Sequence, residues 1–282
     1  MKGIAKTSLL LLVSLFLSGA VLAQKDSTEL QDTRWKMLTY DVGSVFRGIG
    51  FAYSRPLHWE KKQWLTLGGI TAGTGLIYLV DDETSRFVSI QRESIPKFVR
   101  DYGELYGSPE NNYLLTSGVY LAGLIAKDEK LRRTGVLLIA SASAAGVLQQ
   151  VAKSVVGRAR PVSGLGKDTF DPFNSSRNFH SFPSGHTILA FTNAYAIAKQ
   201  FKSPWVKAGF YAIGLVPGAS RLWDQQHWLS DIAFGVALSI VTVESIDRYL
   251  DRRYDKKYTE EDKQLSWDLQ FGPGNVGVVI SF

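Results

Sequence analysis

The chain has 282 residues, of which 45% are hydrophobic, and its net charge is +6, so it can form one large domain or two small ones. It contains no cysteine, which excludes disulfide bonds, a thiol nucleophile and lipid attachment to a cysteine. Its lysines and arginines lie in short stretches between apolar segments and form no continuous basic stripe. We therefore expect an anionic membrane surface as partner, and no nucleic acid.

The first 23 residues have the pattern of a signal peptide. Lys2 and Lys6 give a positively charged start, residues 9–17 are apolar, and small residues lead up to Ala23. The apolar stretch is shorter than the roughly 20 residues that a membrane-spanning helix needs. We predict a signal peptide over residues 1–23 that is cleaved after Ala23, and an uncleaved N-terminal anchor is the alternative.

A polar, amphipathic segment follows over residues 24–62, and six apolar segments recur after it. Each is long enough for a helix, and none alternates in the manner of a strand. They are Trp64–Val80, Tyr113–Ala126, Thr134–Ala152, Thr187–Ala198, Trp205–Ala219 and Leu229–Val243. The sequence therefore predicts an all-α bundle of about six core helices over residues 63–250, with the motifs in a core of 134–246.

Two further regions of the chain are not expected to be apolar helices. Residues 162–182 are rich in Gly, Ser, Asp and Asn, which predicts a loop. Residues 251–282 form a charged tail whose last part alternates weakly and predicts a short hairpin around residues 272–274.

Basic residues between the apolar segments predict an orientation in a membrane. They gather on one side of the expected bundle, whereas all the motifs described below lie on the other, so the positive-inside rule places the motifs outside. The basic residues are Lys127, Lys130, Arg132, Arg133, Lys199, Lys202, Lys207, Arg248, Arg252, Arg253, Lys256 and Lys257.

Two observations oppose the spanning bundle. A cleaved signal leaves residue 24 outside, whereas the segment at Trp64 should begin inside. Several apolar segments are also short, and the mean hydropathy is only -0.03. A periplasmic or peripheral helical domain therefore stays open beside the spanning bundle.

Three short motifs hold a set of side chains suited to a tetrahedral oxyanion. In one-letter form they read K-x6-R-P, P-S-G-H and S-R-x5-H-x3-D. No carboxylate cluster suited to a metal accompanies them, so we expect no cofactor. The positions are Lys153, Arg160, Pro161, Pro183, Ser184, Gly185, His186, Ser220, Arg221, His227 and Asp231.

Lys153, Arg160 and Arg221 supply the positive charge for phosphate oxygens. Arginine offers a planar fork and lysine a compact charge. Lys153 and Arg160 are seven residues apart, so they share one face if a single helix continues up to Pro161, which must end it. Each alone reads as an interfacial cation, and the pattern as a whole favours phosphate binding.

The segment from Pro183 to His186 predicts a helix start that binds an anion. Proline suits the first helical position, and the N–H groups of Ser184, Gly185 and His186 would then point out of the helix. Glycine allows a close approach, and the serine hydroxyl can donate a hydrogen bond.

His227 and Asp231 are four residues apart and are therefore neighbours on one face of a helix. A carboxylate beside an imidazole fixes one tautomer and leaves the other ring nitrogen free as a nucleophile. A histidine with only a structural role would not require Ser220 and Arg221 at a fixed spacing before it in the sequence.

Together the three motifs resemble those of the type 2 phosphatidic acid phosphatase (PAP2) superfamily, which includes bacterial acid phosphatases and vanadium haloperoxidases. The resemblance implies that His227 attacks phosphorus and that Asp231 orients it. His186 would protonate the leaving oxygen and later activate water. Lys153, Arg160, Ser184, Gly185 and Arg221 would hold the phosphate oxygens, with no metal.

The leading function is hydrolysis of a lipid phosphomonoester or pyrophosphate at the outer side of the inner membrane. A periplasmic acid phosphatase for soluble phosphomonoesters is the first alternative. A vanadium haloperoxidase and a non-catalytic phospholipid-binding protein are further alternatives. Loops 81–112 and 162–182 should set the choice of lipid. We interpret His180 as an ordinary polar residue of the loop. Trp223 and Trp228 either line an entry for an acyl or prenyl chain or anchor the protein at the membrane interface.

Overall fold

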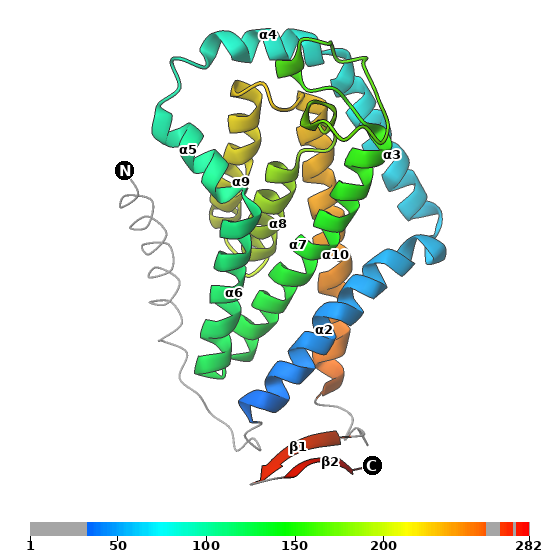
Figure 1. Ribbon diagram of the computed structural model, residues 1–282, viewed down its shortest axis with the longest axis vertical. Helices are drawn as coiled ribbons and strands as arrows, with labels where there is room; N and C mark the ends of the chain where they lie inside the picture. The colour runs from blue at the N-terminus through cyan, green and yellow to red at the C-terminus, as the bar shows by residue number, and fades with distance from the viewer. Residues whose placement is uncertain (1–32, 258–265, 273–274, 282) are drawn as a thin grey trace. The chain divides into compact units, whose positions relative to one another are not determined.

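The computed structural model describes residues 33–257, 266–272 and 275–281. The predicted signal peptide, residues 1–23, lies outside the described residues. Most of the described part of the chain is helical (Figure 1). The helices are α2 (Arg34–Ser54), η1 (Arg55–His58), α3 (Lys61–Leu79), α4 (Asp81–Gln91), α5 (Lys97–Tyr106), α6 (Pro109–Ala126), α7 (Glu129–Val156), η2 (Pro161–Ser163), η3 (Arg177–Phe179), α8 (Gly185–Ala198), α9 (Pro204–Trp223) and α10 (Leu229–Lys257).

The helix ends follow from local chemistry. Pro109 and Pro204 stand at the first turns of α6 and α9, where a missing N–H costs nothing. Asp128 caps α7, because its carboxylate accepts a hydrogen bond of 2.7 Å from the N–H of Leu131. Gly157 ends α7 in the left-handed region, with φ +58°.

Helix α8 lies at the centre of the bundle. It packs against α7, α9 and α10, and 11 of its 14 residues are buried. This agrees with its apolar sequence, since a helix that is hydrophobic all round is buried on every side. Leu137 and Leu138 of α7 and Val243 and Ile246 of α10 are also fully buried in this core.

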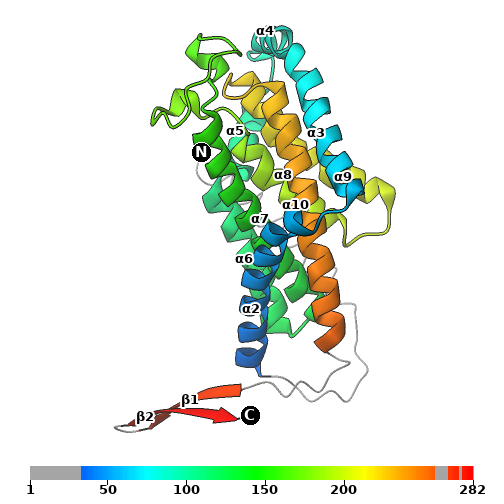
Figure 2. The same ribbon diagram turned by 90° about the vertical axis from the view of Figure 1, so that its right-hand side faces the viewer.

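Helix α2 packs along α7 and α10, whereas α3 follows α10 further along the bundle (Figure 2). Helix α2 carries a carboxylate, Asp41, that is buried and paired. Asp41 accepts hydrogen bonds from Arg132 at 2.9 Å, Tyr120 at 3.1 Å and Tyr254 at 2.6 Å. A buried carboxylate is tolerated only with such partners, so Asp41 joins α2 to α6, α7 and α10.

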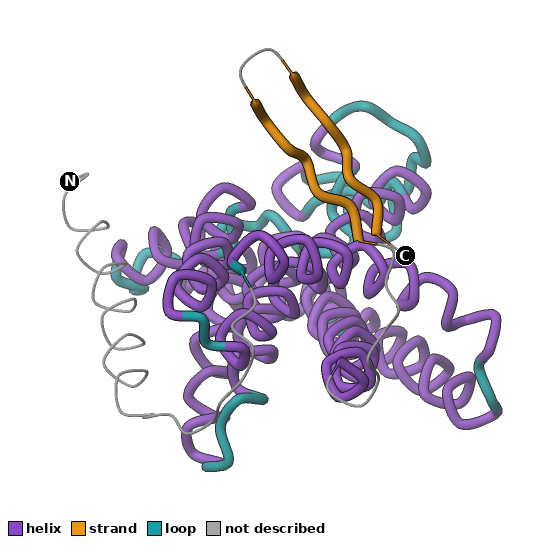
Figure 3. The backbone as a smooth tube through the Cα atoms, turned by 90° about the horizontal axis from the view of Figure 1, so that it is seen from below, coloured by secondary structure: helices purple, strands orange, loops and turns teal. Residues whose placement is uncertain are grey.

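The predicted all-α class is confirmed, since the six apolar segments lie in α3, α6, α7, α8, α9 and α10. The hairpin expected around residues 272–274 is also present as β1 (Ser266–Gly272) and β2 (Asn275–Ser281), which pair antiparallel (Figure 3). The boundary placed at residue 250 falls inside α10.

Two helices in the described part, Glu129–Val156 and Leu229–Lys256, are long and apolar enough to cross a membrane by length and composition. Of their most apolar windows, 56% and 44% is buried inside the protein, so a role in the core explains the same composition. Helix α3 has no buried residue and exposes Leu65, Leu76 and Leu79.

Candidate active site

The three motifs meet at one end of the bundle. Lys153 lies in the last turn of α7, His186 in the first turn of α8, and Arg221 in the last turn of α9. Asp231 lies in the first turn of α10, and His227 just precedes that helix. The loops at this end are covered by α4 and α5 (Figure 1). Because neighbouring helices run antiparallel, the end of one lies beside the start of the next. Residues up to 78 positions apart in the sequence therefore come together here.

Lys153 and Arg160 converge, although not on one helix face as predicted. Gly157 ends α7 three residues before Arg160, whose N–H instead donates to the carbonyl oxygen of Asn178 at 2.8 Å. The carbonyl oxygen of His180 then receives both cations, from Nζ of Lys153 at 2.7 Å and from Nη2 of Arg160 at 3.4 Å. His180, interpreted from the sequence as an ordinary polar loop residue, thus supplies a main-chain acceptor at the site.

Arg160 and Arg221 retain hydrogen-bond donors. Nη1 of Arg160 donates to the side chain of Gln226, and Nη2 of Arg221 lies 3.3 Å from Asp224. The Nε atoms of both arginines are buried and have no hydrogen-bond partner among the described residues. Arg221 is only 8% exposed. Buried donors of this kind are normally paired, so the two guanidiniums are suited to an anion.

Asp231 is fully buried and held by three donors. Its carboxylate accepts hydrogen bonds from Oγ of Ser181 at 2.5 Å, from the N–H of Trp228 at 2.9 Å, and from Nη1 of Arg158 at 2.7 Å. Nδ1 of His227 lies 3.6 Å from Oδ2 of Asp231, which is longer than a hydrogen bond. The carboxylate therefore has a fixed position beside the imidazole.

Both histidines of the site are neutral at pH 7. Burial, opposed by Asp231 and reinforced by Lys153 and Arg160, lowers the pKa of His227 to about 4. Burial, followed by the positive charge of Arg221 and smaller effects of neighbouring groups, lowers the pKa of His186 to about 3. A neutral imidazole at position 227 has a lone pair available for attack.

The start of α8 differs in detail from the prediction. The helix begins at Gly185 with Ser184 as its N-cap, so Pro183 lies before the cap and not at the first helical position. The N–H of Ser184 donates to the carbonyl oxygen of Asp231 at 3.2 Å and does not point out of the helix. The N–H groups of Gly185 and His186 are left as the first free donors of the helix.

Gly185 also has a packing role. A Cβ atom at this position would lie 2.9 Å from Nε2 of Gln149, which is too close for an ordinary contact. Glycine thus lets α8 approach the side chain of Gln149 on α7.

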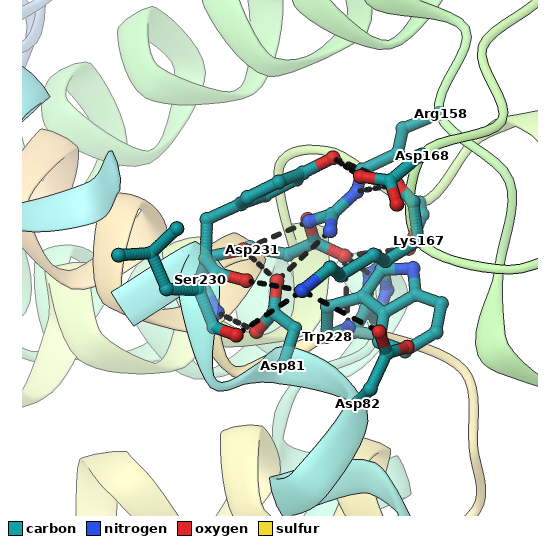
Figure 4. Close-up of polar contacts among 12 residues, drawn as sticks. Asp81, Asp82, Arg158, Lys167, Asp168, Trp228, Ser230 and Asp231 are labelled. Carbon is teal, nitrogen blue, oxygen red and sulfur yellow. Dashed lines mark hydrogen bonds and ion pairs between the residues drawn. The ribbon is translucent and has the colours of Figure 1, made fainter. Parts of the chain in front are cut away.

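Sequence reasoning missed Arg158 and Asp81, which extend the buried network behind Asp231 (Figure 4). Nη2 of Arg158 lies 2.8 Å from Oδ2 of Asp81. Asp81 also accepts hydrogen bonds from the N–H of Ser230 at 2.9 Å and from its Oγ at 2.5 Å. Arg158 stands two residues before Arg160 in the sequence, but Asp81 gives no sequence signal, because it is 150 residues from Asp231.

The close approach of α5 to two motif residues was also missed. A Cβ atom at Gly103 would lie 2.3 Å from Cβ of Ser220, and one at Gly107 would lie 2.7 Å from Cβ of His186. The two glycines are four residues apart and let α5 and its end lie against the site. Trp228, by contrast, lines no entry, because it is 4% exposed and its Nε1 donates to the carbonyl oxygen of Ala159 at 2.8 Å.

Comparisons with known proteins indicate a phosphatase of the PAP2 type. Residues 134–254 match the PAP2 superfamily, and the resemblance drawn from the motifs is thereby confirmed. The chain is 28% identical over 233 residues to a lipid A 1-phosphatase of Rhizobium johnstonii, covering 75% of this chain and 85% of that protein.

Two further relatives carry the same name. The chain is 27% identical over 200 residues to a lipid A 1-phosphatase of Rhizobium etli, covering 64% of this chain and 81% of that protein. A lipid A 1-phosphatase of Porphyromonas gingivalis is 36% identical over 67 residues, which are 23% of this chain and 15% of that protein. These similarities indicate a phosphatase.

Proposed function

We propose that the protein removes a phosphate from a lipid A type of lipid phosphate through a phosphohistidine at His227. The observation that carries the proposal is the convergence of three cations and two neutral histidines at one end of the bundle. The lipid A 1-phosphatases among the relatives support this substrate class. Lys153, Arg160, Ser184, Gly185 and Arg221 are the proposed ligands of the phosphate oxygens.

In the first step the neutral imidazole of His227 attacks phosphorus. The bond from phosphorus to the lipid oxygen breaks as the nitrogen–phosphorus bond forms, and His186 donates a proton to the leaving oxygen. In the second step His186 accepts a proton from water, which attacks the phosphohistidine and releases phosphate. The three cations hold the equatorial oxygens and stabilise the charge that develops on them.

Asp231 has the proposed role of orienting His227. Its three donors fix the carboxylate 3.6 Å from Nδ1, and a small tightening brings the two groups into hydrogen-bond range. This contact would stabilise the imidazole as its other nitrogen takes up phosphorus, since a nearby carboxylate favours the positively charged ring.

The test of the activity is phosphate release by the purified protein in detergent. The panel contains lipid A carrying its 1-phosphate, phosphatidic acid, phosphatidylglycerophosphate, undecaprenyl pyrophosphate and soluble phosphomonoesters. We expect release from a lipid substrate that disappears in His227→Ala and persists in His58→Ala, an exposed histidine on η1. Full activity of His227→Ala, or release from soluble esters only, would overturn the proposal.

We further propose that the bundle lies in the inner membrane with this site facing the periplasm. Exposed apolar side chains on the outer helices support it, among them Leu114, Leu121 and Ile125 of α6. The motifs lie at the end of α7 that is opposite to its basic start. Part of that basic charge is paired internally, since Arg133 contacts Asp247 at 2.8 Å, but the orientation rule counts lysines and arginines regardless of acidic partners.

Reporter fusions test this orientation. We expect reporters after Val162 and after Leu222 to read as periplasmic and a reporter within residues 127–133 to read as cytoplasmic. Periplasmic signals at all three positions, with release of the protein by osmotic shock, would contradict a spanning bundle and favour a periplasmic domain.

A further inference from the structure

A cavity of about 600 Å³ lies at the motif end of the bundle. Its basic lining residues come from segments that are distant in the sequence. Arg92, Lys97 and Arg100 belong to the region of α4 and α5, Arg177 belongs to η3, and Arg221 ends α9. The two loops expected to choose the substrate, 81–112 and 162–182, therefore meet here. We call this cavity the mouth cavity.

The mouth cavity adjoins the proposed phosphate site. Arg221 lines it and is also one of the proposed ligands of phosphate. Gln226 lines it too, and its side chain accepts a hydrogen bond from Arg160. A ligand in the cavity therefore lies beside the proposed phosphate site.

The charge of the mouth cavity is positive. It is lined by five basic and three acidic side chains, which gives a net charge of +2. One carboxylate, Asp224, is shared among three guanidiniums, at 3.3 Å from Arg92, 3.8 Å from Arg100 and 3.3 Å from Arg221. Glu104 also lies 4.0 Å from Arg221. Two carboxylates that face three guanidiniums still leave the group with an excess of positive charge.

Three arginines of the cavity have hydrogen-bond donors to spare. The guanidinium of Arg177 forms no ion pair or hydrogen bond with any described residue. Nε of Arg100 is buried and has no hydrogen-bond partner in the described part of the chain. Arg221, more than nine-tenths buried, likewise has no hydrogen-bond partner for its Nε among the described residues. Planar forks of this kind match the oxygens of a phosphate group.

We propose that the mouth cavity binds a second phosphate group of the substrate, so that the preferred substrates are lipids that carry two phosphates. The proposal rests on the proposed function, because the first phosphate must occupy the site at His227. Arg100 and Arg177 bind the second phosphate, with Arg92 as a further ligand, and Asp224 holds Arg92 and Arg100 in place.

Electrostatic coupling places the second phosphate close to the first. Burial, and then the positive charges of Arg177 and Arg221, lower the pKa of Arg160. The positive charge of Arg177 therefore affects Arg160 at the phosphate site. Two phosphates bound side by side would relieve the repulsion among these arginines, which favours a bisphosphate over a monophosphate. An acyl chain does not suit this lining, in which Val162 is the one large apolar side chain.

The experiment compares matched ligands that have one or two phosphates. A series of alkanediol bisphosphates of different lengths and the corresponding alkyl monophosphates compete with p-nitrophenyl phosphate for the wild-type protein in neutral detergent. We expect at least one bisphosphate to inhibit with a Ki about tenfold lower than its monophosphate. We expect Arg177→Gln and Arg100→Gln each to reduce this preference about three- to tenfold, as for the loss of one ordinary hydrogen bond.

Arg86→Gln is the matched control, because Arg86 is exposed on α4 and lies outside the mouth cavity. It should keep the preference of the wild type. If no bisphosphate binds more tightly than its monophosphate, or if Arg177→Gln and Arg100→Gln keep the preference, the proposal is wrong. The proposed function is judged separately, by whether phosphate is released from a lipid phosphate in a manner that depends on His227.

A second arm distinguishes a phosphate of the substrate from the headgroup of a neighbouring lipid. Hydrolysis of the monophosphates is measured in micelles with and without phosphatidylglycerol. The proposal expects no activation that depends on Arg177. Activation by phosphatidylglycerol that is lost in Arg177→Gln would assign the arginines to neighbouring headgroups and overturn the proposal.

Discussion

Arg158 and Asp231 form a buried ion pair, with Nη1 of the arginine 2.7 Å from Oδ1 of the carboxylate and side-chain exposures of 2% and 0%. The other nitrogen of the same guanidinium reaches Asp81 at 2.8 Å. One arginine thus joins the start of α4 to the start of α10. We infer that the position of Asp231, and through it that of His227, depends on a residue outside the three motifs.

Replacement of this arginine should damage both stability and activity. Arg158→Gln leaves two buried carboxylates without their charge partner, and breaking a buried pair in this way costs about 3–5 kcal/mol. We expect a clearly lower melting temperature and a fall in kcat, measured with a soluble phosphomonoester. Arg158→Lys should recover part of kcat, because it restores a charge but only one of the two contacts. Unchanged kcat in Arg158→Gln would show that Asp231 keeps its position without Arg158.

Gly107 sets the position of His186 by close contact. Gly107→Ala places a Cβ atom 2.7 Å from Cβ of His186, so the imidazole or α5 must shift. We expect kcat on a lipid phosphate to fall about tenfold or more, since small misplacements of a catalytic group have large effects. Gly118→Ala is the control, because a Cβ atom there meets nothing within 4 Å. Equal activity of the two variants would contradict this role for Gly107.

The two histidines should be separable by leaving group. His227→Ala removes the nucleophile and should abolish turnover of every substrate. His186→Ala removes a proton donor, which is typically worth about 10²–10⁴-fold in rate. That loss should be greatest for a basic lipid alkoxide and smaller for nitrophenyl phosphate, which leaves without much help. Rates for both variants on both substrates check this, and equal losses throughout would remove the basis for distinct roles.

Substrate binding should be coupled to proton uptake. In the free protein the pKa of His186 is about 3 and that of His227 about 4, so both rings are neutral at pH 7. A bound phosphate offsets the charge of Lys153, Arg160 and Arg221 and raises the pKa of His186, which then gains the proton that it donates. Vanadate binding at about pH 6 should take up a proton in the wild type but not in His186→Ala.

Calorimetry in two buffers of different ionisation enthalpy measures this uptake. The same shifts predict the pH profile. We expect kcat/KM to rise with pH through about 4, as His227 loses its proton. We expect kcat to decline on the basic side when the protonated His186 of the complex is lost. A wild type that binds vanadate without proton uptake would argue against His186 as the acid.

Chelation should leave the activity unchanged, because Lys153, Arg160 and Arg221 supply the positive charge for the phosphate oxygens. We expect full phosphate release after treatment with EDTA and inhibition by vanadate, which adopts the five-coordinate geometry of the phosphoryl group on His227. Activity that is lost on chelation and restored by a divalent ion would show that these three side chains do not supply the positive charge by themselves.

The sequence alone determined the helical class, the positions of the apolar helices and the identity of the motif residues. Helices could be predicted because their apolar pattern is local, as in residues 134–152 and 187–198. The motifs could be read because the chemistry of a phosphate requires a few residue types at close spacing, such as His227 and Asp231. The hairpin between β1 and β2 was likewise signalled locally, by Gly272 and by the Pro273-Gly274 pair that follows it in the sequence.

The tertiary structure decided what these residues contact. That Gly157 separates Lys153 from Arg160, that His180 offers its carbonyl oxygen to both cations, and that Asp81 lies behind Asp231 all depend on how distant segments pack. Such contacts have no period and no fixed spacing in the sequence. The mouth cavity is of the same kind, since charged side chains in two loops define a site only when the bundle brings the loops together.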